Sequence, residues 1–450
     1  MDSYHIPKSR RILRPQWVLG PEGLRSGIEV VIEAGRVAQL RAQTGPVDLP
    51  GHALLPGFVN AHSHAFQRGL RGHVQWRQGS DDFRTWRERM YALATGLDPD
   101  GVEAVSALAF LEMALAGITT VGEFHYLHHN PDGAPYADPD ELARRVIAAA
   151  RRVGLRICLL RVAYHRAGAG RPPTPAQRRF VDPTPERALD ALTRLQKLDD
   201  PAVSVGLAPH SVRAVPAPWL RTFAEARLDV PVHAHVAEQP FELEECRAEH
   251  GADPLAVFER AGLVDDRFCA VHLTWPAEGD RERLRAAGAR VCACPSTELD
   301  LGDGFLPVDK LEGVEVCLGS DSHALIDPLF EARALELHAR GVQGRRNVLS
   351  PPDAPDGLAL RLLDAATAHG ARALGVDAGR IAVGAWADLV AVDLRDPVFA
   401  GARPLPTLVF CGHPRLVRAV WVAGEPVVTE GQHPQAPAIL EAAEAALRAT

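Results

Sequence analysis

Histidines and carboxylates follow short apolar segments at several places in this 450-residue chain, a pattern typical of metal ligands. His62 and His64 lie two residues apart, so side-chain alternation along a strand would direct both imidazoles to one face. His235, His272 and Asp321 each stand at the end of another such segment. Imidazole and carboxylate groups suit Zn²⁺, and Fe²⁺ or Mn²⁺ would also be tolerated. Together these residues predict one catalytic metal, whereas His62 and His64 alone would be weak evidence.

The chemistry of such a centre would be hydrolysis. A bound divalent ion lowers the pKa of water to about 7 and stabilises the oxyanion of a tetrahedral intermediate. Glu238 lies three residues after His235, where it can carry a proton to a leaving nitrogen. Asp321 can both bind the ion and accept the proton of the water. His233 and His323 are interpreted as core histidines or contacts of the ligands, with substrate contact also open for His323.

These candidates need a scaffold that gathers distant residues at one rim. The parallel strands of a (β/α)₈ barrel do this, because their carboxyl ends all meet on one face. Strand-like and helix-like segments alternate through the middle of the chain, as expected for a parallel sheet. The eight predicted strands are Leu54–His64, Ile118–Glu123, Arg156–Val162, Val203–Pro209, Val232–Val236, Phe268–His272, Arg290–Cys294 and Val314–Ser320. The sequence therefore predicts an α/β fold with a TIM-like (β/α)₈ barrel.

Both ends of the chain carry short β-like segments that differ from the alternating middle. Examples are residues 28–33 and 37–40 near the start, and 387–392 and 417–422 near the end. Terminal segments of like character predict one small β-sandwich, built from both chain ends, with the barrel inserted in it. The predicted boundaries are 1–55 and 376–432 for the β-sandwich, 56–375 for the barrel and 433–450 for a C-terminal helix.

Two segments depart from the strand and helix repeat. Residues 168–175 form a Gly/Pro-rich stretch within the 167–184 loop, and long loops after a barrel strand are usually functional or disordered. Residues 82–96 predict an extra helix after the first strand. Either segment could cover the site, and a solvent-exposed excursion is equally open. Three histidines after the second predicted strand are interpreted as loop residues: His125, His128 and His129.

Composition limits the partners and the compartment. The net charge of −8 gives no sign of a basic surface, so neither nucleic acid nor an anionic membrane is an expected partner. No run approaches the ~18 apolar residues of a spanning helix, and residues 1–8 lack the apolar region of a signal peptide. Cys292 and Cys294 have a C-x-C spacing that is unusual for zinc and predicts buried core thiols. A cytoplasmic protein is expected.

The motifs resemble those of the amidohydrolase superfamily. The segment Leu55–His64 is similar to the start of that superfamily's barrel, and His235–Glu238, His272 and Gly319–Asp321 are similar to its mononuclear deaminase pattern. A narrower resemblance, to the formimidoylglutamate deiminases within that superfamily, spans essentially the whole chain. The segments that carry it are His62–Arg68, Phe83–Tyr91, Gly122–His129, Gln177–Phe180 and Ala208–Arg213.

This resemblance implies a site and a reaction. The implied ligands of one Zn²⁺ per subunit are His62, His64, His235 and Asp321, and the implied catalytic residues are Glu238, His272 and Asp321. The implied substrate contacts are Gln67, Arg87, Tyr126, His210 and Arg213. The implied reaction is deimination of N-formimino-L-glutamate by a zinc-bound hydroxide, which yields N-formyl-L-glutamate and ammonia in histidine degradation. A homodimer is also implied, in which Arg87 resembles an arginine that reaches the neighbouring subunit's site.

The residue types agree with a substrate that carries two carboxylates and an amidine. Arg213 can offer a planar fork to one carboxylate, and Glu238 would meet the protonated amidine as a carboxylate. Two other functions stay open. A related mononuclear deaminase could act on a guanine-, cytosine- or adenosine-like ring, although a chain with 6% aromatic residues supplies little ring stacking. A non-catalytic scaffold could keep the barrel for assembly, although such a protein is free to lose its ligands.

Overall fold

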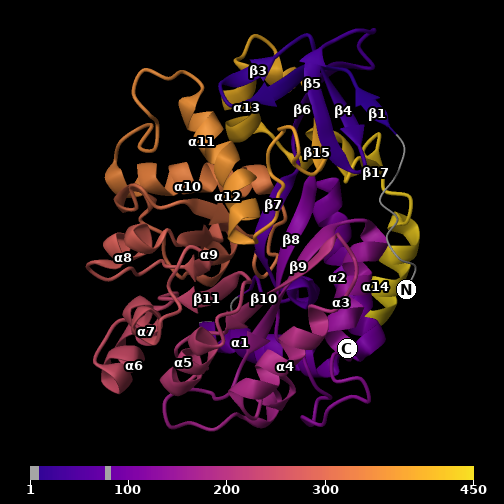
Figure 1. Cartoon of the computed structure of the whole chain (residues 1–450). Coiled ribbons are helices and arrows are strands. Elements are labelled where there is room, and N and C mark those ends of the chain that lie inside the picture. Colours follow the sequence, from indigo (N-terminus) through magenta and orange to yellow (C-terminus); the bar gives the residue numbers. More distant parts are fainter. Residues whose placement is uncertain (1–9, 77–82, 450) are drawn as a thin grey trace.

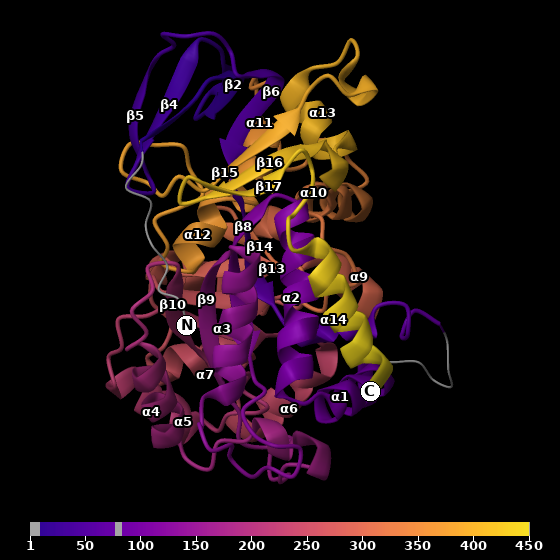
Figure 2. The same ribbon diagram turned by 90° about the vertical axis from the view of Figure 1, so that its right-hand side faces the viewer.

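A computed structural model describes residues 10–76 and 83–449 of the chain (Figure 1). Residues 1–8, which bear on the signal-peptide prediction, and Asp82, at the predicted start of the extra helix, lie outside the described residues. An eight-stranded parallel sheet forms the body of the molecule, and two smaller sheets stand at one end of it (Figures 1 and 2).

The eight parallel strands are joined side by side in chain order. Almost all of their residues are buried, because helices cover the outside and side chains fill the inside. The sheet curls until its first and last strands meet at a bridge between Ser63 and Asp321. The strands are β7 (Phe58–Ser63), β8 (Ile118–His125), β9 (Arg156–Ala163), β10 (Val203–Pro209), β11 (Val232–Val236), β12 (Phe268–His272), β13 (Arg290–Ala293) and β14 (Val316–Leu318). The predicted barrel is confirmed.

The first predicted strand, Leu54–His64, is wrong as a single element. Its first part belongs to β6 (Leu49–Pro56) in a different sheet, and its second part is β7. Gly57 separates the two, and its amide donates to the carbonyl of Asp388 at 2.9 Å. A Cβ on Gly57 would overlap the side chain of Thr119, so glycine is required where the chain changes sheets.

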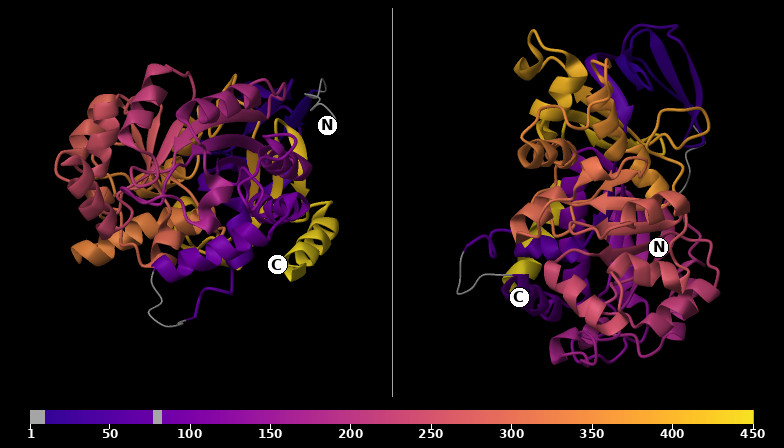
Figure 3. Two further views of the ribbon diagram at one scale, coloured as in Figure 1. Left: turned by 90° about the horizontal axis from the view of Figure 1, so that it is seen from below. Right: turned by 90° about the vertical axis from the view of Figure 1, so that its left-hand side faces the viewer.

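Most helices in the middle of the chain cover the outside of the barrel (Figures 1 and 3). In chain order, the helices of this region are α1 (Phe83–Gly96), which lines the pocket described below, α2 (Pro99–Leu115), α3 (Glu141–Val153), α4 (Pro185–Leu195), α5 (Ala217–Glu225), α6 (Pro240–His250), α7 (Pro254–Ala261), α8 (Asp280–Ala287), α9 (Pro295–Leu301), α10 (Pro328–Gln343), α11 (Gly357–Ala365) and α12 (Ala368–Ala373). Local signals set their ends: Asp98 caps α2 by accepting from the amide of Gly101, and Gly154 ends α3 in the left-handed region. No helix in the described part of the chain is long and apolar enough to cross a membrane.

Both chain ends contribute to the smaller sheets. The three-stranded sheet contains β1 (Arg11–Leu13), β4 (Ile28–Glu33) and β5 (Arg36–Ala42). The six-stranded sheet has the order β17 (Glu425–Thr429), β16 (Val417–Val422), β15 (Leu389–Asp393), β6, β2 (Pro15–Gly20) and β3 (Gly23–Arg25). The predicted β unit built from both ends is confirmed, while its exact boundaries stay a prediction. Two helices complete this end of the chain: α13 (Pro404–Cys411), and α14 (Ala436–Ala449), which packs along α2 (Figure 2).

The predicted core thiols lie inside the barrel. Cys292 and Cys294 are fully buried in one apolar cluster with Cys269 of β12 and Cys317 of β14. The core interpretation of the C-x-C pair is therefore confirmed, because these thiols pack against one another and against neighbouring alanine and valine side chains.

A buried ion pair joins the barrel to the six-stranded sheet. Arg156 of β9 donates to both carboxylate oxygens of Asp388, at 2.9 and 3.3 Å. The side chains are 3% and 0% exposed, and Asp388 also accepts from the amide of Ala423 at 2.7 Å. Both charges are thus matched by close partners in a region from which water is excluded.

We expect Asp388→Ala to lower the free energy of unfolding by about 3–5 kcal/mol, because the guanidinium of Arg156 would stay buried without its carboxylate. The measurement is the shift of the thermal or urea unfolding transition. Glu444→Gln, which removes one half of the exposed pair between Glu444 and Arg448, is the control and is expected to leave the transition unchanged. Equal transitions for Asp388→Ala and the parent would contradict the assigned role.

Candidate metal centre and active site

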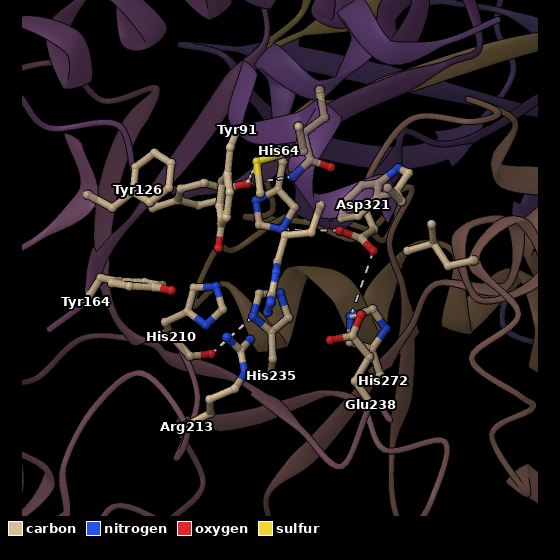
Figure 4. Close-up of a pocket in the computed structure, with 16 residues that line it drawn as sticks. His64, Tyr91, Tyr126, Tyr164, His210, Arg213, His235, Glu238, His272 and Asp321 are labelled. Carbon is tan, nitrogen blue, oxygen red and sulfur yellow. Dashed lines mark hydrogen bonds and ion pairs between the residues drawn. The ribbon is translucent and has the colours of Figure 1, made fainter. Parts of the chain in front are cut away.

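The candidate ligands converge at the carboxyl rim of the barrel (Figure 4). His62 lies in β7, His64 directly after it, His235 in β11, and Asp321 shortly after β14. Nε2 of His64 lies 3.2 Å from Oδ1 of Asp321, and Nε2 of His62 lies 3.4 Å from the same oxygen. Ligand atoms of His62, His235, His272 and Asp321 all lie within 4.8 Å of one another. Four of the five predicted residues therefore share one point, and His64 reaches the same carboxylate oxygen of Asp321 as His62 does.

Hydrogen counting at this point favours a cation. Nδ1 of His64 donates to the carbonyl of Phe124 (2.9 Å) and Nδ1 of His235 to that of His210 (3.1 Å), so both Nε2 atoms keep lone pairs. Nε2 of His235 lies 3.2 Å from Nε2 of His62. Burial lowers the pKa of His62 to about 3, so that ring brings at most one hydrogen to several acceptors. These residues fit a divalent metal, which would satisfy the acceptors together.

A directed chain of hydrogen bonds lies beneath the ligands and crosses from β7 to the segment after β14. Nδ2 of Asn60 donates to Oγ of Ser320 (2.7 Å), which donates to Nδ1 of His323 (2.9 Å). Nε2 of His323 donates to Oγ of Ser63 (3.1 Å), which donates to Glu123 (2.5 Å). His323 therefore contacts the segments that carry the ligands. Glu123 also accepts from the amide of Ala65 (2.8 Å), and burial raises the pKa of Glu123 to about 7.

Several residues of the rim adopt left-handed backbone conformations. The φ angles are 51° at Ala237, 72° at His272, 46° at Asp321 and 62° at His323. Such conformations cost of order 1–3 kcal/mol each for residues with a side chain, and they persist where the surroundings hold them. At Asp321 the holding contacts are its amide, which donates to the carbonyl of His62, and its carbonyl, which accepts from the amide of His64, both at 3.0 Å.

The predicted proton carriers stand beside the ligands. Oε1 of Glu238 lies 3.8 Å from Nε2 of His272, and the same nitrogen lies 3.8 Å from Oδ2 of Asp321. Nδ1 of His272 lies 3.4 Å from Oε1 of Glu298 on α9. Burial lowers the pKa of His272, but the carboxylates of Glu238 and Glu298 outweigh it and raise this pKa well above its ordinary value. Glu298 escaped the sequence analysis, because it follows Pro295 in a helix and carries no motif of its own.

A pocket that is partly open to solvent leads down to this centre. All the predicted substrate contacts line it: Gln67, Arg87, Tyr126, His210 and Arg213. Of the predicted ligands and proton carriers, His64, His235, Glu238, His272 and Asp321 also line it, while His62 lies beneath. The two segments that could cover the site both do so, because α1 contributes Arg87 and the 167–184 loop contributes Phe180.

Several other residues predicted from the sequence lie away from the pocket lining. His233 is buried, and its Nε2 donates to the carbonyl of Ala373 at 2.9 Å, which agrees with a core role. The loop interpretation is wrong for His125, which is the last residue of β8. His128 and His129 follow the strand, and each has a ring nitrogen at a backbone carbonyl.

Arg87 differs from these residues because it lines the pocket. It reaches the pocket of its own chain from α1, so its presence there requires no neighbouring subunit.

The expectation of sparse ring stacking is wrong at the pocket. Five aromatic side chains line it: Trp86, Tyr91, Tyr126, Tyr164 and Phe180. A low aromatic content of the whole chain does not limit the content of one site, because folding gathers aromatic residues from α1, from the 167–184 loop and from the positions directly after β8 and β9. Tyr91 and Tyr164 carried no predicted role, although Tyr91 lies within a motif that marks the resemblance and Tyr164 directly follows a barrel strand, a position that signals a rim residue.

Comparison with known proteins agrees with this geometry. The model of the family described as "Amidohydrolase family" matches residues 53–427. The chain is 40% identical to the formimidoylglutamate deiminase of Pseudomonas aeruginosa, over 92% of this chain and 93% of that protein. It is 31% identical to a 5-methylthioadenosine/S-adenosylhomocysteine deaminase of Halobacterium salinarum, over 84% of this chain and 83% of that protein.

Solved structures show the same architecture. An amidohydrolase from Brucella melitensis matches with a TM-score of 0.89 and 34% identity, over 97% of this chain and 99% of that one. An adenosine deaminase from Xanthomonas campestris with bound zinc matches with a TM-score of 0.82 and 26% identity, over 98% of each chain. The fold, the ligand geometry and the match over most of the sequence lead to one conclusion: the chain belongs to the amidohydrolase family.

Proposed function

We propose that this protein hydrolyses N-formimino-L-glutamate. Water replaces the imino nitrogen at the formimino carbon: the new C–O bond gives N-formyl-L-glutamate, and the broken C–N bond releases ammonia. The support is the 40% identity to a formimidoylglutamate deiminase over almost the whole chain, together with the polarity of the pocket. By the same resemblance we propose that the protein is a cytoplasmic homodimer that acts in histidine degradation.

The polarity of the pocket carries the proposal. Near the metal centre it offers acceptors: the carboxylate of Glu238 and Oε1 of Gln67, which is buried and without a partner among the described residues. Gln67 is oriented by its Nε2, which donates to the hydroxyl of Tyr126 at 2.6 Å. The pocket also offers Arg87 and Arg213; Figure 4 shows Arg213 on the opposite side from Asp321 and His272, and its guanidinium has no ion-pair partner among the residues that the structure describes. An amidine cation fits the first end, and carboxylates fit the second.

The arginine end also distinguishes this substrate from a nucleobase. Aromatic walls alone would suit a ring, and relatives of this chain include deaminases named for adenosine derivatives. The guanidinium of Arg213 forms no ion pair within the part of the chain that the structure describes, so a neutral ring would bury it without a carboxylate partner, which is costly. A dicarboxylate would supply that partner.

Each residue of the centre has its own task in this proposal. A divalent ion held by His62, His64, His235 and Asp321, which we propose to be Zn²⁺, would supply a Lewis acid and lower the pKa of water. Asp321 accepts the proton of the attacking water. Glu238 pairs with the amidine cation and then delivers a proton to the departing nitrogen. Glu298 orients His272 through Nδ1, and Nε2 of His272, which has no hydrogen-bond partner among the described residues, would stabilise the charge that develops on the oxygen of the reacting carbon.

We expect the purified protein to carry about one divalent ion per chain and Asp321→Asn to lose most of it, because the only carboxylate of the ligand set would become neutral. Inductively coupled plasma mass spectrometry after gel filtration measures the ion content. His338→Gln, which changes a histidine of α10 away from the pocket, is the control and should keep the parent's content. Full ion content in Asp321→Asn would remove Asp321 from the ligand set.

We expect Glu238→Gln to lower kcat for ammonia release from N-formimino-L-glutamate by about 10²–10⁴-fold, because the amide cannot carry a proton. The metal content should stay at the parent's value, since Glu238 lies outside the proposed ligand set. Glu244→Gln, which changes an exposed carboxylate on α6, the helix that begins two residues after Glu238, serves as the control and should retain full activity. Comparable kcat values for parent and Glu238→Gln would exclude Glu238 as the proton carrier.

We expect Arg213→Met to raise KM for N-formimino-L-glutamate by about tenfold to a hundredfold, the effect of one lost charge-assisted hydrogen bond. Arg221→Met, which changes an exposed arginine, is the matched control and should leave KM unchanged.

A substrate panel tests the specificity of the parent protein. Ammonia release is measured for N-formimino-L-glutamate, N-formimino-L-aspartate, N-carbamoyl-L-glutamate and guanine. The first should give the highest kcat/KM, and faster turnover of guanine would replace the proposed function with that of a ring deaminase.

A further inference from the structure

The 167–184 loop places a buried amide against two phenols of the pocket. Within this loop, η2 (Pro175–Phe180) carries Gln177, which is 2% exposed. Oε1 of Gln177 accepts from the amide of Thr174 (2.9 Å), and this bond fixes which end of the side chain is the nitrogen. Nε2 then donates to the hydroxyl of Tyr164 (2.6 Å) and to that of Tyr91 (3.0 Å). The loop, α1 and the end of β9 are thus joined at one point of the pocket wall.

Hydrogen counting shows that this cluster must donate outward. Nε2 of Gln177 has two hydrogens and gives one to each phenol oxygen. Each hydroxyl keeps its own hydrogen, and although the two hydroxyls are close enough to interact, only one can donate to the other. At least one O–H therefore needs an acceptor from outside the cluster. Within residues 10–76 and 83–449 the structure shows no hydrogen bond donated by either hydroxyl to such an acceptor.

The charges around the cluster select an anionic acceptor. Arg87 and Arg213 line the same pocket as Tyr91 and Tyr164, and neither arginine can accept a hydrogen bond. Figure 4 shows the hydroxyls of Tyr91 and Tyr164 and the guanidinium of Arg213 on one side of the pocket, with Asp321 and His272 on the other. Burial and the Tyr164 hydroxyl raise the pKa of Tyr91 well above its ordinary value, so its phenol stays protonated at neutral pH.

We propose that Tyr91 and Tyr164, aligned by Gln177, bind the side-chain carboxylate of the substrate, the one farther from the formimino carbon. The inference rests on the proposed function, because it assigns contacts to that same substrate. Tyr91 and Tyr164 touch the carboxylate beside Arg213, and Gln177 is a positioning residue that acts through both phenols. This gives the 167–184 loop a role: it sets the donors that select a substrate with a second carboxylate.

The test compares Tyr91→Phe, Tyr164→Phe and Gln177→Glu with the parent. Each phenylalanine variant should raise KM for N-formimino-L-glutamate by about tenfold to a hundredfold with little change in kcat, because the lost contact is remote from the reacting carbon. Gln177→Glu keeps the size of the side chain but accepts hydrogens from the phenols, so its KM should rise as well. In the Tyr91→Phe/Tyr164→Phe background, Gln177→Glu should add no further increase, an outcome that a merely structural glutamine would not produce.

Calorimetric titration with glutarate, an unreactive dicarboxylate, provides a readout that is independent of turnover. The parent should bind glutarate, and the phenylalanine variants should lose affinity by the same factor by which KM rises. Tyr136→Phe is the matched control, since its hydroxyl lies outside the pocket and its affinity should equal the parent's. Unchanged KM and unchanged glutarate affinity in both phenylalanine variants would overturn the inference. A parent that binds glutarate through these phenols but releases no ammonia would instead refute the proposed function and leave the carboxylate site standing.

Discussion

The backbone contacts that close the barrel also bring the candidate metal ligands together. The first and last barrel strands meet where Asp321 bridges Ser63, and the backbone hydrogen bonds of that bridge run from Asp321 to His62 and from His64 to Asp321. Ligands thus stand on both sides of this junction between the first and last strands, here called the seam. A shift of one strand past the other would separate the carboxylate of Asp321 from the imidazoles of His62 and His64. The directed hydrogen bonds from Asn60 to Glu123 cross the same seam beneath the ligands and oppose such a shift. Backbone strain at Asp321 is tolerated there because these contacts hold the segment.

The pocket above the seam is ordered by charge. Carboxylates of Glu238, Glu298 and Asp321 surround His272 on one side of the pocket, whereas the guanidinium of Arg213 and the hydroxyls of Tyr91 and Tyr164 lie on the other side (Figure 4). Acceptors and donors are thereby separated along the pocket, which orients a substrate that carries a cation at one end and anions at the other. The supporting residues come from segments distant in sequence, so the polarity belongs to the fold and not to any single motif.

The sequence predicts the barrel and its ligands well, because both depend on local patterns. His62, His235, His272 and Asp321 each stand at a strand end, and strand ends of a parallel barrel meet at one rim. The break at Gly57 was missed, since an apolar run continues through it and only the overlap with Thr119 reveals the change of sheet. Glu123, Glu298 and Gln177 were given no role for a related reason: their tasks depend on partners that pack against them only in three dimensions. Whole-chain composition also misled about aromatic residues, which folding concentrates at the pocket.

The change of sheet at Gly57 bears on how such barrels can be recombined. The chain enters the barrel directly from β6, and the same junction is tied to Asp388, which also neutralises Arg156 of the barrel. A chimaera that exchanged only the barrel between relatives would cut through this junction and leave Arg156 facing a foreign sheet. An exchange between relatives would have to transfer β6 and the segment around Asp388 along with the barrel. The barrel and the six-stranded sheet can therefore be exchanged only together.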